Sequence, residues 1–175
     1  TSGTFVDLTT NQTVAGAKTF SSDITVNGIT VGRGAGANNT TNTATGVSAL
    51  QNNTLSGVNN TANGYQALMK NIGGYGNTAS GSSALFNNST GVDNTALGYN
   101  ALVGNTTGQN NIGIGVVAGA SNTTGGYNIS IGKEAMLSNN GNANVAVGAG
   151  SMDRVTSGDY NVVLGGFAGR YYGTG

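Results

Sequence analysis

The stretch NTALGYNAL at residues 94–102 nearly repeats NTANGYQAL at residues 60–68. The shared pattern is an Asn, a β-branched residue, a small residue, a variable residue and a Gly, and it recurs eight times. The copies begin at Asn42, Asn60, Asn77, Asn94, Asn111, Asn128, Asn144 and Asn161. These starts lie 18, 17, 17, 17, 17, 16 and 17 residues apart. A fixed period of this kind predicts a solenoid, in which each repeat forms one coil that stacks on the next.

Two columns of the aligned repeats never change. The first is the leading Asn, and stacked Asn side chains can form an amide ladder in which each donates to its neighbour. The second is the Gly four residues later, at Gly46, Gly64, Gly81, Gly98, Gly115, Gly132, Gly148 and Gly165. An unbroken Gly column predicts a corner with positive φ, or a contact too close for a Cβ atom.

The residues between Asn and Gly predict a short β-strand. The second column is Thr, Ile or Val throughout, which favours a strand, and its change from Thr to Ile after Thr95 is interpreted as a buried position. The third column is small, which predicts close approach of another backbone or sheet. Each repeat is therefore predicted to be a strand, a Gly corner, a second short strand and a closing loop. The fold class is all-β, a parallel β-solenoid or β-roll over residues 42–175.

Residues 1–41 lie outside this register. Asn27-Gly28, between two β-rich runs, is a strong hairpin-turn signal. ITVG at residues 29–32 is interpreted as a degenerate forerunner of the repeat. We predict a β-structured N-terminal connector here.

Composition excludes several classes of function. Six Lys and Arg balance six Asp and Glu, and only 7% of residues are charged, which argues against a nucleic-acid partner. No apolar run approaches the roughly 20 residues that span a bilayer. The chain has no His and no Cys, so we expect no enzyme, no cofactor and no metal site. Asp93, Asp153 and Asp159 could ligate Ca2+, but the Gly-Gly-x-Gly-x-Asp repeat is missing, and solvated carboxylates are the favoured interpretation.

The thinness of such a coil bears on its assembly. Its interior columns are small, and Leu50, Leu68, Leu85 and Leu102 are the larger members. Because little apolar area would be buried by one chain, we predict a parallel homotrimer with a shared core, in which the small residues lie where chains meet. A single solenoid with capped ends is the alternative.

Two families resemble this chain. QTVAGAKTFSSDITVNGITVGRGAG at residues 12–36, followed by the NTAxGxxAL and NTTG repeats, resembles bacteriophage tail fibres over essentially the whole chain. NISIG and NVAVG are similar to the head repeats of trimeric autotransporter (YadA-like) adhesins, which form a left-handed parallel β-roll from slightly shorter repeats. The first resemblance implies a rigid trimeric rod on a virion or outside the cell, which attaches to a host surface. The second implies a bacterial surface adhesin.

Tyrosines are the candidate contacts for a host glycan or protein. They are Tyr65, Tyr75, Tyr99, Tyr127 and Tyr160. They could stack on sugar rings, or they could cover the contact between chains or pack over Gly, which is the favoured interpretation. The Thr column also suggests a third function, a monomeric ice- or mineral-binding solenoid.

Overall fold

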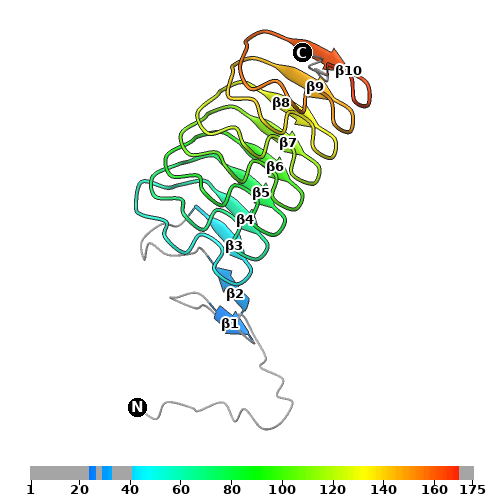
Figure 1. Cartoon of the computed structure of the whole chain (residues 1–175). Helices are drawn as coiled ribbons and strands as arrows, with labels where there is room; N and C mark the ends of the chain where they lie inside the picture. The colour runs from blue at the N-terminus through cyan, green and yellow to red at the C-terminus, as the bar shows by residue number, and fades with distance from the viewer. Residues whose placement is uncertain (1–23, 27–28, 33–40, 170–175) are drawn as a thin grey trace, which may run out of the picture.

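A computed structural model describes residues 24–26, 29–32 and 41–169 of the chain. They form one ten-stranded sheet in chain order, and the described residues contain no helix. The strands are β1 (Ile24–Val26), β2 (Ile29–Gly32), β3 (Thr43–Thr45), β4 (Thr61–Asn63), β5 (Thr78–Ser80), β6 (Thr95–Leu97), β7 (Ile112–Ile114), β8 (Ile129–Ile131), β9 (Val145–Val147) and β10 (Val162–Leu164). Each of β3 to β10 is one rung of a β-solenoid (Figure 1). The predicted fold class is confirmed.

The rungs stack with every repeat column in register. Between β4 and β5, Thr61 pairs with Thr78, Ala62 with Ala79 and Asn63 with Ser80, all in parallel. The same offsets hold from β3 to β10. Residues that share a column in the alignment of the repeats therefore lie next to one another in successive coils.

The N-terminal strands extend the sheet differently. β1 and β2 pair antiparallel, with Val26 opposite Ile29, as the hairpin prediction requires, although residues 27–28 themselves lie outside the described residues. β2 then pairs antiparallel with β3, with Val31 opposite Thr45. Residues 29–32, which resemble the strand of the repeat, are a β-strand of the connector and not a solenoid rung, because a rung would run parallel to β3. These four residues instead cover the first edge of the parallel sheet.

The half of each coil that follows the Gly corner is a set of turns. The predicted second strand was wrong, because alternate residues there have positive φ, as at Gln66 (57°) and Leu68 (51°). Left-handed residues turn the chain back on itself where a strand would extend it. Successive coils remain hydrogen-bonded on this side, for example from Leu68 N to Ala84 O across 3.0 Å.

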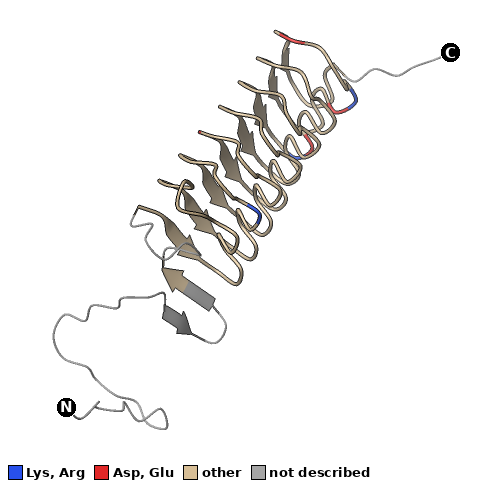
Figure 2. Cartoon of the chain, turned by 90° about the vertical axis from the view of Figure 1, so that its left-hand side faces the viewer, with Lys and Arg blue, Asp and Glu red and all other residues tan. Residues whose placement is uncertain are grey.

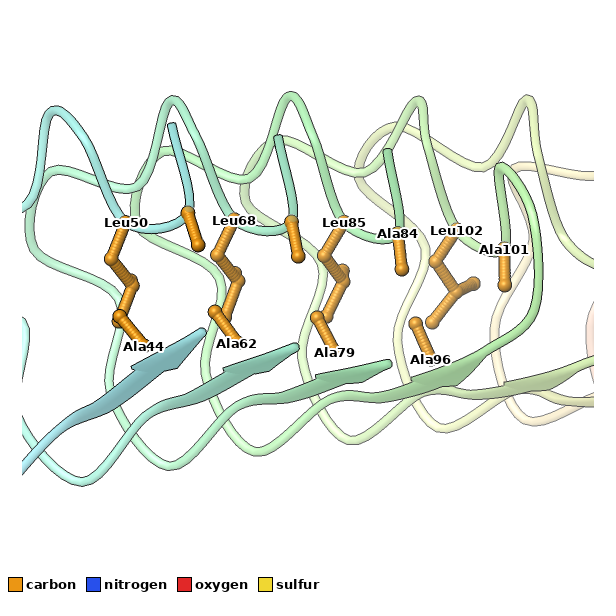
Figure 3. Packing of buried hydrophobic residues seen from close by; sticks show 12 residues of the cluster. Ala44, Leu50, Ala62, Leu68, Ala79, Ala84, Leu85, Ala96, Ala101 and Leu102 are labelled. Carbon is orange, nitrogen blue, oxygen red and sulfur yellow. The ribbon is translucent and has the colours of Figure 1, made fainter. Parts of the chain in front are cut away.

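Each coil encloses its own apolar interior. The middle residue of each strand points inward, and Ala44, Ala62, Ala79 and Ala96 are fully buried. They face a column of buried leucines, Leu50, Leu68, Leu85 and Leu102 (Figure 3). The expectation that the small residues lie where chains meet was wrong, since these residues face the coil's own turns.

Candidate functional site

The leading Asn column is buried from Asn42 to Asn144 and joins each coil to the next. Each side-chain oxygen accepts a hydrogen bond from the backbone N–H of the following Asn, at 2.7–3.0 Å. Each amide group from Asn42 to Asn144 also donates to the Gly carbonyl that closes its own coil. Direct amide-to-amide bonds are formed by Asn77, Asn94, Asn144 and Asn161 with the preceding column member. The predicted ladder is confirmed at those steps, and backbone groups carry it at the others.

A second Asn column, on the turn side, was missed by the sequence interpretation. Its buried members are Asn53, Asn71, Asn88, Asn105, Asn122 and Asn139. Asn71 donates to Asn53, Asn88 to Asn71 and Asn105 to Asn88, at 2.7–2.9 Å. The signal was present, because each of these residues lies 11 positions after a leading Asn.

The Gly corners have both properties that the sequence indicated. Their φ values lie between 113° and 140°. A Cβ atom on Gly98 would lie 2.6 Å from the carbonyl oxygen of Gly115 in the next coil. The column is therefore structural, since it lets neighbouring corners approach at a conformation that L side chains rarely adopt.

The first and third residues of each strand point out of the coil, and together they form what we call the outer face. Thr43, Thr61, Thr78 and Thr95 are exposed on it. The interpretation of this column as buried was wrong, because side chains alternate along a strand and the small middle residue takes the inward position.

The outer face changes character along the rod. Over β3 to β5 its residues are Thr, Asn and Ser, whereas from Leu97 onward the third strand position is always apolar. Over β7 to β10, which we call the apolar end, every outward residue is Ile, Val or Leu. On the apolar end, Val162 and Leu164 of β10 are 69% and 66% exposed, whereas the outward residues of β7, β8 and β9 are half-buried. None of these outward residues is charged, and Figure 2 shows the described charged residues on loops and turns.

An apolar, uncharged sheet face is unusual in contact with water. The solvated face of a sheet normally carries polar side chains that alternate with the buried ones. Contiguous apolar patches on a protein surface mark sites of interaction. The apolar end is therefore the candidate functional site. Its side chains point out of the coil, so packing within the coil does not explain why they are apolar.

The predicted tyrosines are all exposed, but the structure does not bring all five together. Tyr65 and Tyr99 share the column that follows the Gly corner, on one flank of the outer face. Tyr75, Tyr127 and Tyr160 precede the leading Asn, on the opposite flank. Their exposed fractions range from 47% at Tyr75 to 83% at Tyr160.

The described residues offer little electrostatic chemistry. Among them, no three acidic, His or Cys side chains are grouped closely enough to hold a metal ion. Asp93 and Asp159 are exposed on different coils, and the Asp159 carboxylate accepts a hydrogen bond from Asn142 N across 2.6 Å. The interpretation of Asp153 as a solvated carboxylate was wrong, because it is 5% exposed. No described segment forms a helix long and apolar enough to cross a membrane.

No protein-family model, curated protein or solved structure matches the chain. The geometry of the coil and its outer face therefore carries the functional argument.

Proposed function

We propose that this chain is a structural and adhesive segment of a phage-type tail fibre, a rigid homotrimeric rod for attachment to a host surface. The observation that supports it is the uncharged apolar end of the outer face, β7 to β10, which lies outside the coil's own core. Its branched apolar side chains are half-buried on β7 to β9 and exposed on β10, along one side of the rod. Another copy of the same face would cover them.

The pattern along the rod favours parallel, in-register association. The outer face is polar at β3 to β5 and apolar at β7 to β10. Two antiparallel copies would place Ile and Val against Thr, Asn and Ser, which would strand hydroxyl and amide groups against apolar surface. Parallel copies place apolar rungs against apolar rungs and hydroxyls against hydroxyls. The number of three chains comes from the resemblance to fibres and adhesins.

The energy of such an interface comes from the apolar area that association would cover. Fully burying an exposed Val, Leu or Ile side chain contributes about 1.5–3 kcal/mol; the apolar end offers eight such residues per chain, two on each of four strands, and the six on β7 to β9 contribute less because they are already half-buried. Association costs roughly 4–15 kcal/mol in lost freedom of motion. Three parallel chains then present every surface contact three times, and avidity multiplies weak binding.

Two other functions remain open on the same fold. A bacterial trimeric adhesin head would use the same interface, and only the attached domains would differ. A monomeric ice- or mineral-binding solenoid is favoured by one observation, the exposed column Thr43, Thr61, Thr78 and Thr95. That column presents hydroxyl and methyl groups at the regular spacing of stacked strands, about 4.8 Å.

Sedimentation equilibrium of the full 175-residue chain tests the proposal. We expect a trimer at micromolar concentration. The variant Ile129→Thr with Ile131→Asn gives β8 the outward residues of β4, Thr61 and Asn63, while Ser130 keeps its inward position. We expect this variant to dissociate at a concentration at which the wild type is assembled, with its β-sheet circular dichroism retained.

The matched control is Leu55→Asn, which removes an exposed Leu (64% exposed) from a loop outside the sheet. It should leave the mass unchanged. A wild-type chain that stays monomeric at high micromolar concentration would overturn the proposed assembly. Thermal hysteresis of that monomer in freezing-point measurements would support the ice-binding alternative.

A further inference from the structure

The coil of residues 111–127 differs from those before it. Gly113 and Gly119 stand where the four preceding coils have a buried Ala and a buried Leu. One apolar core cluster ends at Leu102, and the next begins at Met136. The coil between them contributes little more than Ala118 and Ala120 to the interior.

Leu102 compensates for part of the missing volume. A Cβ atom on Gly113 would lie 2.7 Å from Leu102 Cγ, and one on Gly119 would lie 2.7 Å from Leu102 Cδ2. The side chain of Leu102 therefore occupies space that belongs to the next coil, and Figure 3 shows it turned differently from Leu85. One Leu serves two coils here. On the other side, Ser130 places a buried hydroxyl that has no hydrogen-bond partner within the described chain.

Both Asn columns weaken at the same place. Among the described residues, no amide-to-amide bond joins Asn111 to Asn94 or to Asn128, and the backbone N–H bonds and the amide bonds to each coil's own Gly carbonyl hold the column there. The first step, from Asn42 to Asn60, is built in the same way. In the second column the ladder stops at Asn105, whose side-chain oxygen has no partner among the described residues. Asn122 bonds within its own turn instead, to N and O of Gly125 at 2.9 Å.

The backbone ladder, by contrast, is unbroken across this coil. Leu102 N donates to Ala118 O and Gly119 N to Ala135 O, both across 2.9 Å. The coil is thus held in the rod by its main chain, with less support from core packing and from side-chain amides than its neighbours have.

We infer that residues 111–127 form a compliant joint, a coil that opens locally more readily than the coils on either side. The stability of a solenoid is a sum of the stabilities of its units and of their nearest-neighbour interfaces. Both terms are reduced here, because the interior is emptier and two amide ladders lose links. The joint divides the rod into a unit with a Leu core on its N-terminal side and a unit with a Met core on its C-terminal side.

The two units also carry different surfaces. The polar part of the outer face belongs to the Leu-core unit, and the apolar end begins at the joint and continues over the Met-core unit. The joint thus lies where the two surfaces of the rod meet.

Hydrogen exchange at individual amides of the full chain tests this inference. The probes are Val117, Gly119 and Ser121, which donate to neighbouring coils. Their counterparts are Ser83, Leu85 and Asn87 on the Leu-core side and Met136 and Gly150 on the Met-core side, whose bonds do not involve the joint. After correction for intrinsic rates, we expect the joint amides to exchange at least about ten-fold faster, as for sub-global opening.

A variant that restores the missing side chains, called the repair variant, is the second part of the experiment. Gly113→Ala with Gly119→Leu restores the residues of the preceding coils, and Leu102 can then return to its own coil. We expect exchange in the joint to slow to the level of Leu85, while exchange at Leu85 is unchanged. Ser151→Ala is the control, since it changes the single exception in the buried Ala column outside the joint. Equal exchange rates in the three wild-type coils would overturn the inference, whether or not the repair variant folds. A folded repair variant whose joint amides exchange as fast as in the wild type would overturn it too.

Discussion

The backbone N–H of Asn77 donates to the side-chain oxygen of Asn60 across 2.9 Å, and the Asn77 side-chain amide donates to the same oxygen across 3.1 Å. The two residues are 17 positions apart and occupy the same place in successive coils. The Asn60 side chain therefore satisfies buried backbone groups of two coils at once, because its amide also donates to Gly74 O of its own coil. Asn is the residue that supplies both a donor and an acceptor at this height.

Replacing Asn77 by Ala should destabilise the fold strongly. The change would leave the N–H of Asn94 without a partner in a buried site, at about 1–3 kcal/mol. It would also remove one of the two amide donors to Gly91 O, which keeps only Asn88. Chemical denaturation followed by circular dichroism, at one fixed chain concentration, measures the effect. Thr78→Ala, one residue later but exposed, should cost less than about 1 kcal/mol. Equal losses for both variants would contradict the ladder's role.

Replacing Gly98 by Ala should prevent normal stacking of two coils. Gly98 has φ of 132°, and the added Cβ would meet Gly115 O at 2.6 Å. Backbone strain of roughly 1–3 kcal/mol would add to the cost of forcing two main chains apart. The control is Gly166→Ala, where φ is not positive and the nearest atom, Ala149 O, is 3.7 Å away. Thermal denaturation should show a large loss for the first variant and almost none for the second.

Truncation of Leu102 should cost more than truncation of Leu85, although both are buried leucines of one column. Leu85→Ala should cost about 2–5 kcal/mol, the usual range for such a cavity. Leu102→Ala should exceed it, because Leu102 also fills the space beside Gly113 and Gly119. Denaturant midpoints of the two variants, measured side by side, decide the order. A smaller effect at Leu102 would show that the joint coil collapses to fill the space.

Tyr99 and Tyr65 should differ in their effect on assembly. Both are about half exposed in the column after the corner, each with a Val on one neighbouring coil and Ser82 on the other. Tyr99, however, follows the apolar Leu97 and lies next to the apolar end, whereas Tyr65 follows the polar Asn63. We therefore expect Tyr99→Ala to weaken self-association, and Tyr65→Ala to leave it unchanged. Sedimentation equilibrium measures both. Weaker assembly in Tyr65→Ala alone would contradict the placement of the interface at the apolar end, and loss of glycan binding without any change in mass would assign these side chains to host contact.

The number and boundaries of the coils were predictable from the sequence alone. Each coil meets a neighbour of nearly the same sequence, so whatever contact works once is repeated at the same offset. Stacking requires Asn in the leading column, because Asn satisfies the buried backbone groups, and Gly in the corner column from Gly46 to Gly165, because Gly allows the close approach. The second Asn column repeats just as regularly, at a different position within the repeat.

Which side of each strand faces inward was decided only by the tertiary structure. Alternation along a strand creates two faces, but Thr at the first position and Ala at the second are compatible with either orientation. In the closed coils beneath the Leu column the small Ala takes the inward position, so the Thr residues lie outside; at the last rung Val163 takes that position against the Met cluster. Likewise, the positive φ of 51° at Leu68 cannot be predicted from its residue type. That conformation is sustained by the hydrogen bond from Leu68 N to Ala84 O and by burial of the side chain, and both exist only once the next coil is in place.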